Sequence, residues 1–272
     1  RVISLVMMVF ALVPVIAPTL GAGIAWMFGW RMIFVSFVVF SVISVSWLWL
    51  RQPETHPVEK RRPFRLTEIL SGIREIVSYK QVVLTITAQS LLYAMLFVAL
   101  MTSQPIFEQV FGRGPSFPLW FGLCAAISAS ASLINAAIVI RLGMRTVVLR
   151  SLAVQIITSI VFLGVLVFSE SYGNGVFAVF FVWKISVFFM AGLGIGNLNA
   201  IAMEPVGHMA GLAASIISAS ATVIGALVAV PVSLMFDGTP MPALLGTMTA
   251  AIVCFALVQS LETQEAIEAP VD

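Results

Sequence analysis

The stretch Val13–Phe34, VPVIAPTLGAGIAWMFGWRMIF, decides the fold class because it sets prolines and glycines within a long apolar run. It has the pattern of a membrane helix, a very short turn and the start of a second helix. Pro14 and Pro18 each remove a backbone donor, and a bilayer tolerates such a loss only where neighbouring helices satisfy the backbone again. We therefore expect this first helix to be packed in a bundle.

The composition indicates an all-α integral membrane protein with several spans. Of the 272 residues, 60% are hydrophobic and 10% are charged, with a mean hydropathy of +1.08, whereas a soluble domain carries about 25% charged residues. The net charge of +2 gives no indication of nucleic-acid binding. Cys124 and Cys254 lie in apolar spans as expected buried thiols, and no cysteine or histidine spacing predicts a metal or other cofactor.

A hydrocarbon core requires about 20 apolar residues per helix, and by that rule the sequence contains eight spans. They cover residues 2–28, 32–50, 82–101, 119–140, 147–168, 176–202, 210–236 and 243–261. An even number of spans places both termini on the same side of the membrane. Eleven of the 14 Lys and Arg residues lie at residue 1, in 51–80 or just after Ile140, so the positive-inside rule predicts cytoplasmic termini and a cytoplasmic central connection.

That connection, 51–80, is the sizeable polar segment of the chain. Its first part carries three prolines and mixed charge, which is typical of a flexible linker. Its second part places Leu66, Ile69, Leu70, Ile73 and Ile76 at spacings of three and four residues. This pattern predicts an amphipathic helix along the cytoplasmic membrane surface.

Two joints between predicted helices resemble each other. The joints Met27–Trp30 and Met235–Gly238 each follow a helix that contains Gly and Pro, which is a weak indication of an internal repeat.

Three glycines, at 192, 194 and 196, lie inside an apolar span and follow no strand. We therefore expect close helix contacts there and no phosphate binding.

Several motifs resemble one transporter family. Ala17-Pro18-Thr19-Leu20-Gly21-Ala22 is similar to the Gly-Pro-x-x-Gly-Gly signature of the fifth helix in drug:proton antiporters of the major facilitator superfamily. Ala17 and Ala22 replace two of its glycines, and Gly23 is adjacent. The segments 1–10, 28–34 and 197–215 resemble the bicyclomycin-resistance (Bcr/CflA) branch, and 102–105 resembles it more loosely.

The resemblance covers the whole chain and implies a major facilitator fold in which the eight spans are helices five to twelve of twelve. Residue 1 is Arg, with no convincing signal peptide, so we expect an N-terminally truncated chain. The implied parts are 1–50, the last two helices of the N-terminal half; 51–80, the linker; 81–262, the C-terminal six-helix half; and 263–272, a cytoplasmic tail. The implied location is the bacterial inner membrane.

The resemblance assigns the first helix to the antiporter motif, which is implicated in the direction of exchange and in sealing the closed state. Its residues here are Pro14, Ala17, Pro18, Gly21 and Gly23. Ordinary packing by small residues around a proline kink is the alternative explanation. We expect Pro14, Pro18 and Gly21 to have the least complete surroundings in this chain.

A cavity for varied apolar drugs needs aromatic surface and a few polar groups. The candidate cavity residues are Gln89, Tyr93, Phe97, Gln104, Asn135, Lys184, Asn197, Asn199, Ser215, Ser218 and Thr222, with Phe107, Trp120 and Trp183 as further aromatics. The alternative is that the polar groups join helices and the aromatics face lipid.

A lysine inside an apolar span and a loop motif each have two possible interpretations. Lys184 is the basic residue well inside a span, and it either couples substrate or proton movement or snorkels towards the outer headgroups. Glu204, Pro205, Gly207, His208 and Gly211 form a cytoplasmic loop motif in the resemblance. Glu204 and His208 are expected to be a solvated pair or a helix-start feature.

The leading functional hypothesis is secondary active efflux of small molecules in exchange for protons, with the lipid bilayer as environment and no obligatory protein partner. The acidic residue that such coupling usually needs is absent from all eight predicted spans. The alternative is a truncated, transport-inactive fragment. A channel or an intramembrane enzyme is less favoured, because His56 and His208 are the histidines of the chain and both fall in predicted loops.

Overall fold

The computed structural model describes residues 20–21, 23–52 and 66–261, and every regular element in these ranges is a helix. The long helices are α2 (Arg31–Arg51), α4 (Lys80–Met101), α6 (Phe117–Leu142), α7 (Met144–Phe168), α8 (Asn174–Met203), α9 (Ala210–Leu234) and α10 (Met241–Gln259). Shorter elements are α3 (Leu66–Ser78), α5 (Ser103–Pro105), the π-helix η2 (Ile106–Val110) and the 3-10 helices η3 (Gly114–Ser116) and η4 (Glu204–Met209). The long helices correspond to the second to eighth predicted spans.

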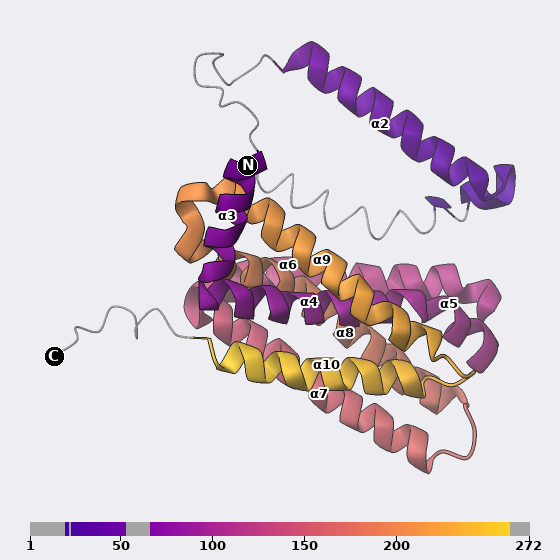
Figure 1. The fold of residues 1–272 in the computed structure, drawn as a ribbon. Coiled ribbons are helices and arrows are strands. Elements are labelled where there is room, and N and C mark those ends of the chain that lie inside the picture. Colours follow the sequence, from indigo (N-terminus) through magenta and orange to yellow (C-terminus); the bar gives the residue numbers. More distant parts are fainter. Residues whose placement is uncertain (1–19, 22, 53–65, 262–272) are drawn as a thin grey trace.

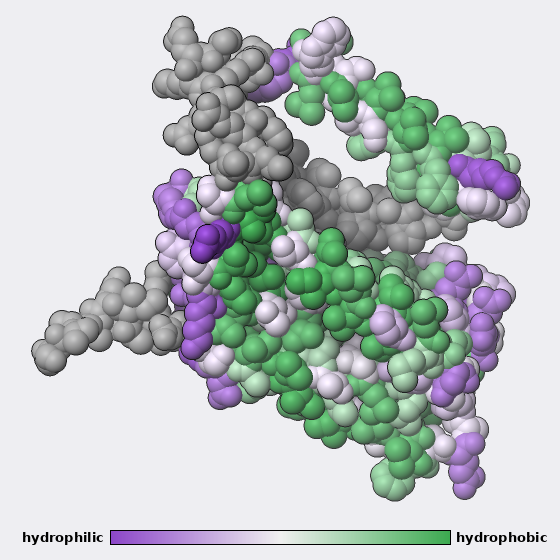
Figure 2. Space-filling view, in the orientation of Figure 1, coloured by the Kyte–Doolittle hydropathy of each residue, from purple (hydrophilic) through white to green (hydrophobic). Residues whose placement is uncertain are grey.

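The described ranges contain six segments long and apolar enough to cross a membrane. One of them, Asn174–Leu234, contains both α8 and α9, because only the short η4 separates these two helices. On the face seen in Figure 2, apolar residues cover the middle of the bundle as a belt, and hydrophilic residues gather at its two ends. These features define a multi-pass membrane protein. Most of the first predicted span lies outside the described residues, although 20–21 and 23–28 are helical.

The helices from α4 to α10 form a bundle around α4 and α8 (Figure 1). α4 packs against α8, α9 and α10, whereas α8 packs against α4, α6 and α7. α7 and α10 also contact each other, and they pack against α8 and α4, respectively. The arrangement is therefore a row in the order α9, α4, α8, α6, with α10 and α7 forming a second layer on one side of it.

Glycines allow the closest of these helix contacts. A Cβ atom at Gly225 of α9 would lie 2.9 Å from the Ser90 carbonyl oxygen and 3.1 Å from the Ala94 nitrogen of α4. On α8, a Cβ at Gly194 would lie 2.6 Å from Leu92, and one at Gly192 would lie 3.0 Å from Ala131 of α6. The predicted close contacts are confirmed for Gly192, which faces α6, and for Gly194, which faces α4. The prediction is wrong for Gly196, where an added Cβ would have no described atom within 4 Å.

The two joints that suggested an internal repeat share a backbone feature. Gly29 before α2 has φ +83° and Gly238 before α10 has φ +84°, a left-handed conformation that favours glycine. The second joint is closed by Asp237, whose carboxylate accepts bonds from the Thr239 hydroxyl at 2.6 Å and backbone nitrogen at 3.0 Å. The bond from the Thr239 hydroxyl is the main reason that the pKa of Asp237 is lowered.

The predicted amphipathic helix is confirmed as α3, which crosses one end of the bundle and packs against α4 and α9. Ile76 is fully buried, and Gly72 lies against the Leu212 side chain. Leu70 is exposed. The apolar face of α3 is thus divided between protein contact and the surroundings.

Helix α2 differs from the other long helices because none of its residues is buried, and Figure 1 shows it apart from the bundle. Gly21 and Gly23, which precede it, have no described atom within 4 Å of an added Cβ. Several other glycines share this property, so the expectation for Gly21 stays a prediction. Pro14, Ala17 and Pro18 lie outside the described residues.

Candidate functional site

The side of α4 that carries Tyr93 and Phe97 borders its contact with α9. Leu92 meets Gly194 of α8, and the Ala88 carbonyl accepts a bond from the Cys254 thiol of α10. Ser90, Tyr93 and Ala94 approach Gly225 of α9, where an added Cβ would lie 2.6 Å from the Tyr93 Cβ. Phe97 lies one turn further along the same side as Tyr93. These two rings are half-buried and stacked, with centroids 5.8 Å apart.

Lys184 of α8 is buried at the contact between α8 and α4. Its ammonium donates a 2.6 Å hydrogen bond to the Ala99 carbonyl of α4, and it lies 5.8 Å and 5.6 Å from the ring centroids of Phe180 and Phe188. The residue is 1% exposed, so the snorkelling interpretation is wrong. Within the described ranges, no carboxylate forms an ion pair with it.

Asn135 of α6 and Asn197 of α8 form a reciprocal amide pair. The Asn197 amide nitrogen donates to the Asn135 oxygen at 2.8 Å, and the reverse bond is 3.5 Å long. Asn197 also donates to the Leu193 carbonyl at 2.8 Å. This pair joins the two helices at the end of the row α9, α4, α8, α6.

We expect the Asn135–Asn197 pair to contribute measurably to stability. Replacing either residue by Leu removes the interhelical bond, and such bonds between membrane helices couple by about 0.6 kcal/mol, with a maximum of about 1.7 kcal/mol. A double-mutant cycle on the unfolding free energy in detergent measures this coupling. Additive single effects would contradict the pairing.

The remaining candidate cavity residues separate into three groups. Gln89 is buried between α4 and α8, where its amide nitrogen approaches the Ile195 carbonyl at 3.5 Å. Ser215, Ser218 and Thr222 lie on the side of α9 next to Gly225; Ser215 donates to the Gly211 carbonyl, and Thr222 to that of Ser218. The Gln89 and Asn199 side-chain oxygens are buried and accept no hydrogen bond from any described residue. Gln104 is separate from all of these.

Gln104 lines a pocket of about 500 Å³ at the far end of α4, together with Glu108, Gln109, Phe117 and Phe121. The helical path continues past Met101 through α5 and η2, so Glu108 lies on an extension of the third predicted span. The span predicted from the sequence ends at residue 101. A π-helix after a proline restores the path, and such turns are frequent at functional sites.

The further aromatic candidates are part of the core. Phe107 and Trp183 are fully buried, and Trp120 packs on Phe177 with centroids 4.9 Å apart. Arg113 lies 3.9 Å above the Phe177 ring. This cluster closes the end of the bundle opposite Lys80, so Phe107 and Trp183 stabilise the fold.

A polar cluster between α7 and α8 was missed by sequence analysis. Ser186 donates to the Gln155 side-chain oxygen at 2.7 Å and shares a 2.9 Å bond with Thr158. Trp183 donates to Ser159 at 3.1 Å. The spacing of Gln155, Thr158 and Ser159 places them on one face of an apolar helix, and this spacing was the available signal.

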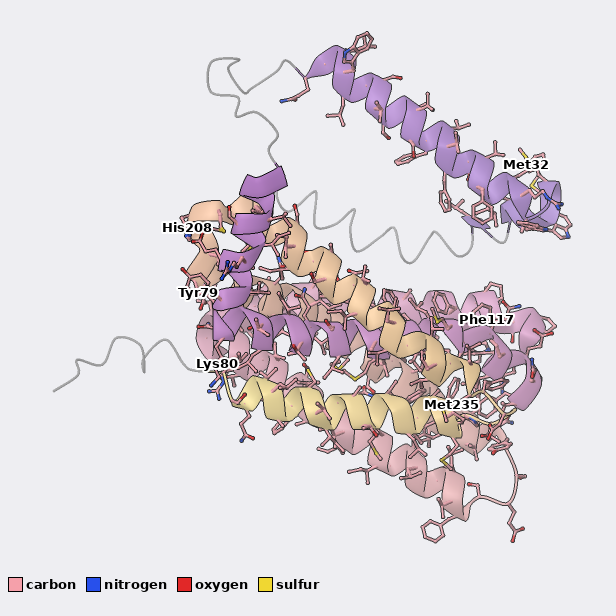
Figure 3. All side chains as sticks on the ribbon, in the orientation of Figure 1. Met32, Tyr79, Lys80, Phe117, His208 and Met235 are labelled. Carbon is pink, nitrogen blue, oxygen red and sulfur yellow. The ribbon has the colours of Figure 1, made fainter. Side chains whose placement is uncertain are left out.

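The loop motif at 204–211 has a partner that the sequence did not indicate. The His208 Nε2 lies 2.9 Å from the Glu75 carboxylate of α3, so the expectation of a Glu204–His208 pair is wrong. Glu204 instead begins η4, which agrees with the alternative of a helix-start feature, and Pro205 follows it there. Gly207 and Gly211 have no described atom within 4 Å of an added Cβ. His208 thus connects η4 to α3 at the end of the bundle labelled by Lys80 in Figure 3.

The fold and the buried polar groups define a multi-pass helical membrane protein with a half-buried aromatic and polar face. Comparison with known proteins then identifies the family: residues 1–230 match the Major Facilitator Superfamily, and the chain belongs to it. The chain is 27% identical to the bicyclomycin resistance protein homolog of Haemophilus influenzae over 259 residues, which are 94% of this chain. It spans 63% of that relative's length. This similarity agrees with the resemblance of the sequence motifs to the Bcr/CflA branch, and the superfamily points to a transporter.

Proposed function

We propose that this chain supplies the last eight helices of a twelve-helix permease that exports drug-like molecules in exchange for protons. The observation that carries the proposal is Lys184, a basic group buried at membrane depth and held by a single backbone carbonyl. A charge in such a place is costly and is typical of ion or substrate pathways. The similarity to a bicyclomycin resistance protein homolog supports drugs as the substrate class.

The substrate surface in this proposal is the face of the row α9, α4, α8 that holds Tyr93, Phe97 and Phe188. The stacked rings offer apolar contact without a fixed polar pattern, which suits varied solutes. The free oxygens of Gln89 and Asn199 supply acceptors for a solute donor. Asn135, Asn197, Ser218 and Thr222 border this face with hydroxyl and amide groups that already hold helix contacts.

Proton exchange in this proposal uses the Lys184 amine. The charged form donates to the Ala99 carbonyl, which also accepts a 2.5 Å bond from the Ser103 hydroxyl. When a solute or a helix movement changes this contact, the cost of keeping the charge changes as well, and the proton can be released. The antiporter-motif helix, with Pro14, Ala17, Pro18, Gly21 and Gly23, seals the closed state against the partner half.

The proposed location is the bacterial inner membrane, with the end that carries Lys80, Arg141 and Arg145 in the cytoplasm. This assignment follows the positive-inside rule, since Arg113 is the basic residue of the opposite loops between α4 and α10. In this orientation α3 and the His208–Glu75 contact lie on the cytoplasmic side.

Dye efflux tests the proposal directly. Cells that express the complete reading frame should extrude a lipophilic dye, and an uncoupler that dissipates the proton gradient should stop the extrusion. Extrusion that continues after uncoupling would contradict proton exchange. Absence of extrusion from the complete protein would contradict drug export. Extrusion by the complete protein but not by the 272-residue chain expressed alone would favour the alternative, a truncated, transport-inactive fragment.

A further inference from the structure

A second site lies on the outside of the bundle, between α6, α7 and α8. It is a crevice of about 360 Å³ with mainly apolar walls, which include Leu142, Val154, Val182 and Phe189. Val154 and Val182 are 54% and 57% exposed, so the crevice opens onto the apolar belt of the protein. It lies outside the face proposed for substrate.

The length of the crevice corresponds to one leaflet of a membrane. Its wall on α7 runs from Val147 to Thr158, a distance of about 16 Å at ~1.5 Å per residue. The hydrocarbon core of a bilayer is about 30 Å thick. A single acyl chain that enters at one end of the crevice would therefore reach close to the middle of the membrane.

The hydroxyl groups in the crevice are compatible with an apolar ligand, because they are already hydrogen-bonded. Thr158 and Ser186 contribute to the walls, but they bond to each other at 2.9 Å, and Ser186 donates to Gln155 at 2.7 Å. Their hydrogen bonds are thus satisfied within the protein. An acyl chain can lie against them without leaving a buried polar group unpaired.

The basic end of the crevice carries a free positive charge. Arg150 lines the crevice and is exposed, and Arg141 is adjacent in sequence to the lining residue Leu142. Among the described residues, neither guanidinium has a hydrogen-bond or ion-pair partner. Arg145, by contrast with Arg141 and Arg150, has partners: its guanidinium donates to the Val258 and Gln259 carbonyls at the end of α10.

We propose that this crevice binds an anionic phospholipid, with one acyl chain between α6, α7 and α8 and the phosphate on Arg150. The charge complementarity selects the headgroup, because basic pockets between membrane helices bind anionic lipid headgroups. The apolar walls and the length of the crevice select a lipid over a soluble phosphate.

The test uses the complete protein in nanodiscs with a trace of phosphatidylglycerol that carries a photoreactive acyl chain, and phosphatidylcholine with the same chain as comparison. Labelled peptides are identified by mass spectrometry. We expect labelling on α7 and α8 within the crevice, with phosphatidylglycerol favoured about five-fold, as one basic contact near the surface would give. Soluble glycerol phosphate should not compete.

Two matched pairs of variants separate the headgroup from the chain. Arg150→Gln should abolish the preference for phosphatidylglycerol, whereas Arg74→Gln, an exposed arginine on α3, should retain it. Val154→Trp should fill the crevice and prevent labelling by both lipids. Val161→Trp, at an equally exposed position on α7 outside the crevice, should not. Equal labelling by both lipids, or labelling unchanged in Arg150→Gln and Val154→Trp, would overturn the proposal, as would labelling confined to other helices.

Discussion

Gly225→Ala is expected to destabilise the protein by about 1–3 kcal/mol, the usual cost of extra atoms in a packed interior. The new Cβ would lie 2.6 Å from the Tyr93 Cβ, 2.9 Å from the Ser90 oxygen and 3.1 Å from the Ala94 nitrogen. Two of these atoms belong to the α4 backbone, which cannot rotate away as a side chain can. The helices α4 and α9 must therefore separate, and Tyr93 moves with them.

Thermal unfolding in detergent measures this effect, and Gly164→Ala is the matched control. Gly164 lies in α7 and has no described atom within 4 Å of an added Cβ. Alanine favours a helix over glycine by about 1 kcal/mol, so the control should be neutral or stabilising. Two substitutions of the same chemistry are thus expected to have opposite signs. An unchanged or raised midpoint for Gly225→Ala would show that α9 does not approach α4 this closely.

Sequence analysis predicted the helices well because hydrophobic length and turn residues act locally. The bounds of α4, α7 and α8 lie within a few residues of the predicted spans, and Gly29 and Gly238 adopt left-handed turns at the two predicted joints. The exception is the path through η2, which continues beyond the predicted end of the span at residue 101 and packs Ile106 and Phe107 into the core.

The candidate site could be predicted only in part, since composition identifies polar residues in apolar spans without indicating their partners. Lys184, Asn135 and Asn197 were found in this way. Their partners depend on which helices are neighbours, and Ala99 lies 85 residues away in the chain from Lys184. The same limit explains why Glu75 was not predicted as the partner of His208, 133 residues distant.

The buried polar side chains of the bundle are of two kinds: those whose hydrogen bonds are satisfied within the protein, and those that keep an unused donor or acceptor. Gln155, Ser159 and Ser186 satisfy one another, so they hold α7 to α8 and have no capacity for a ligand. Lys184 and the free oxygens of Gln89 and Asn199 retain unsatisfied capacity. A buried group of this second kind costs stability, and a role in transport is a reason for the protein to keep it.

Lys184→Met is therefore expected to have opposite effects on stability and on transport. Met keeps much of the length of the side chain but removes a buried charge that has one carbonyl acceptor, and apolar replacement of buried charged groups is often neutral or stabilising by about 1–4 kcal/mol. Proton-driven dye efflux, by contrast, should fall to the level of cells without the protein. Both quantities are measured on the same variant, by thermal unfolding in detergent and by efflux from cells.

Two further variants assign the cause of the loss. Lys80→Met removes an exposed lysine at the start of α4 and should change neither property. Lys184→Arg keeps the positive charge but holds its proton at all relevant pH values. If the Lys184→Arg variant still exports dye in a way that an uncoupler stops, the charge alone is needed and proton release from this group is excluded. Wild-type efflux by Lys184→Met would remove Lys184 from the mechanism altogether, and its burial would then reflect helix packing through the Ala99 carbonyl.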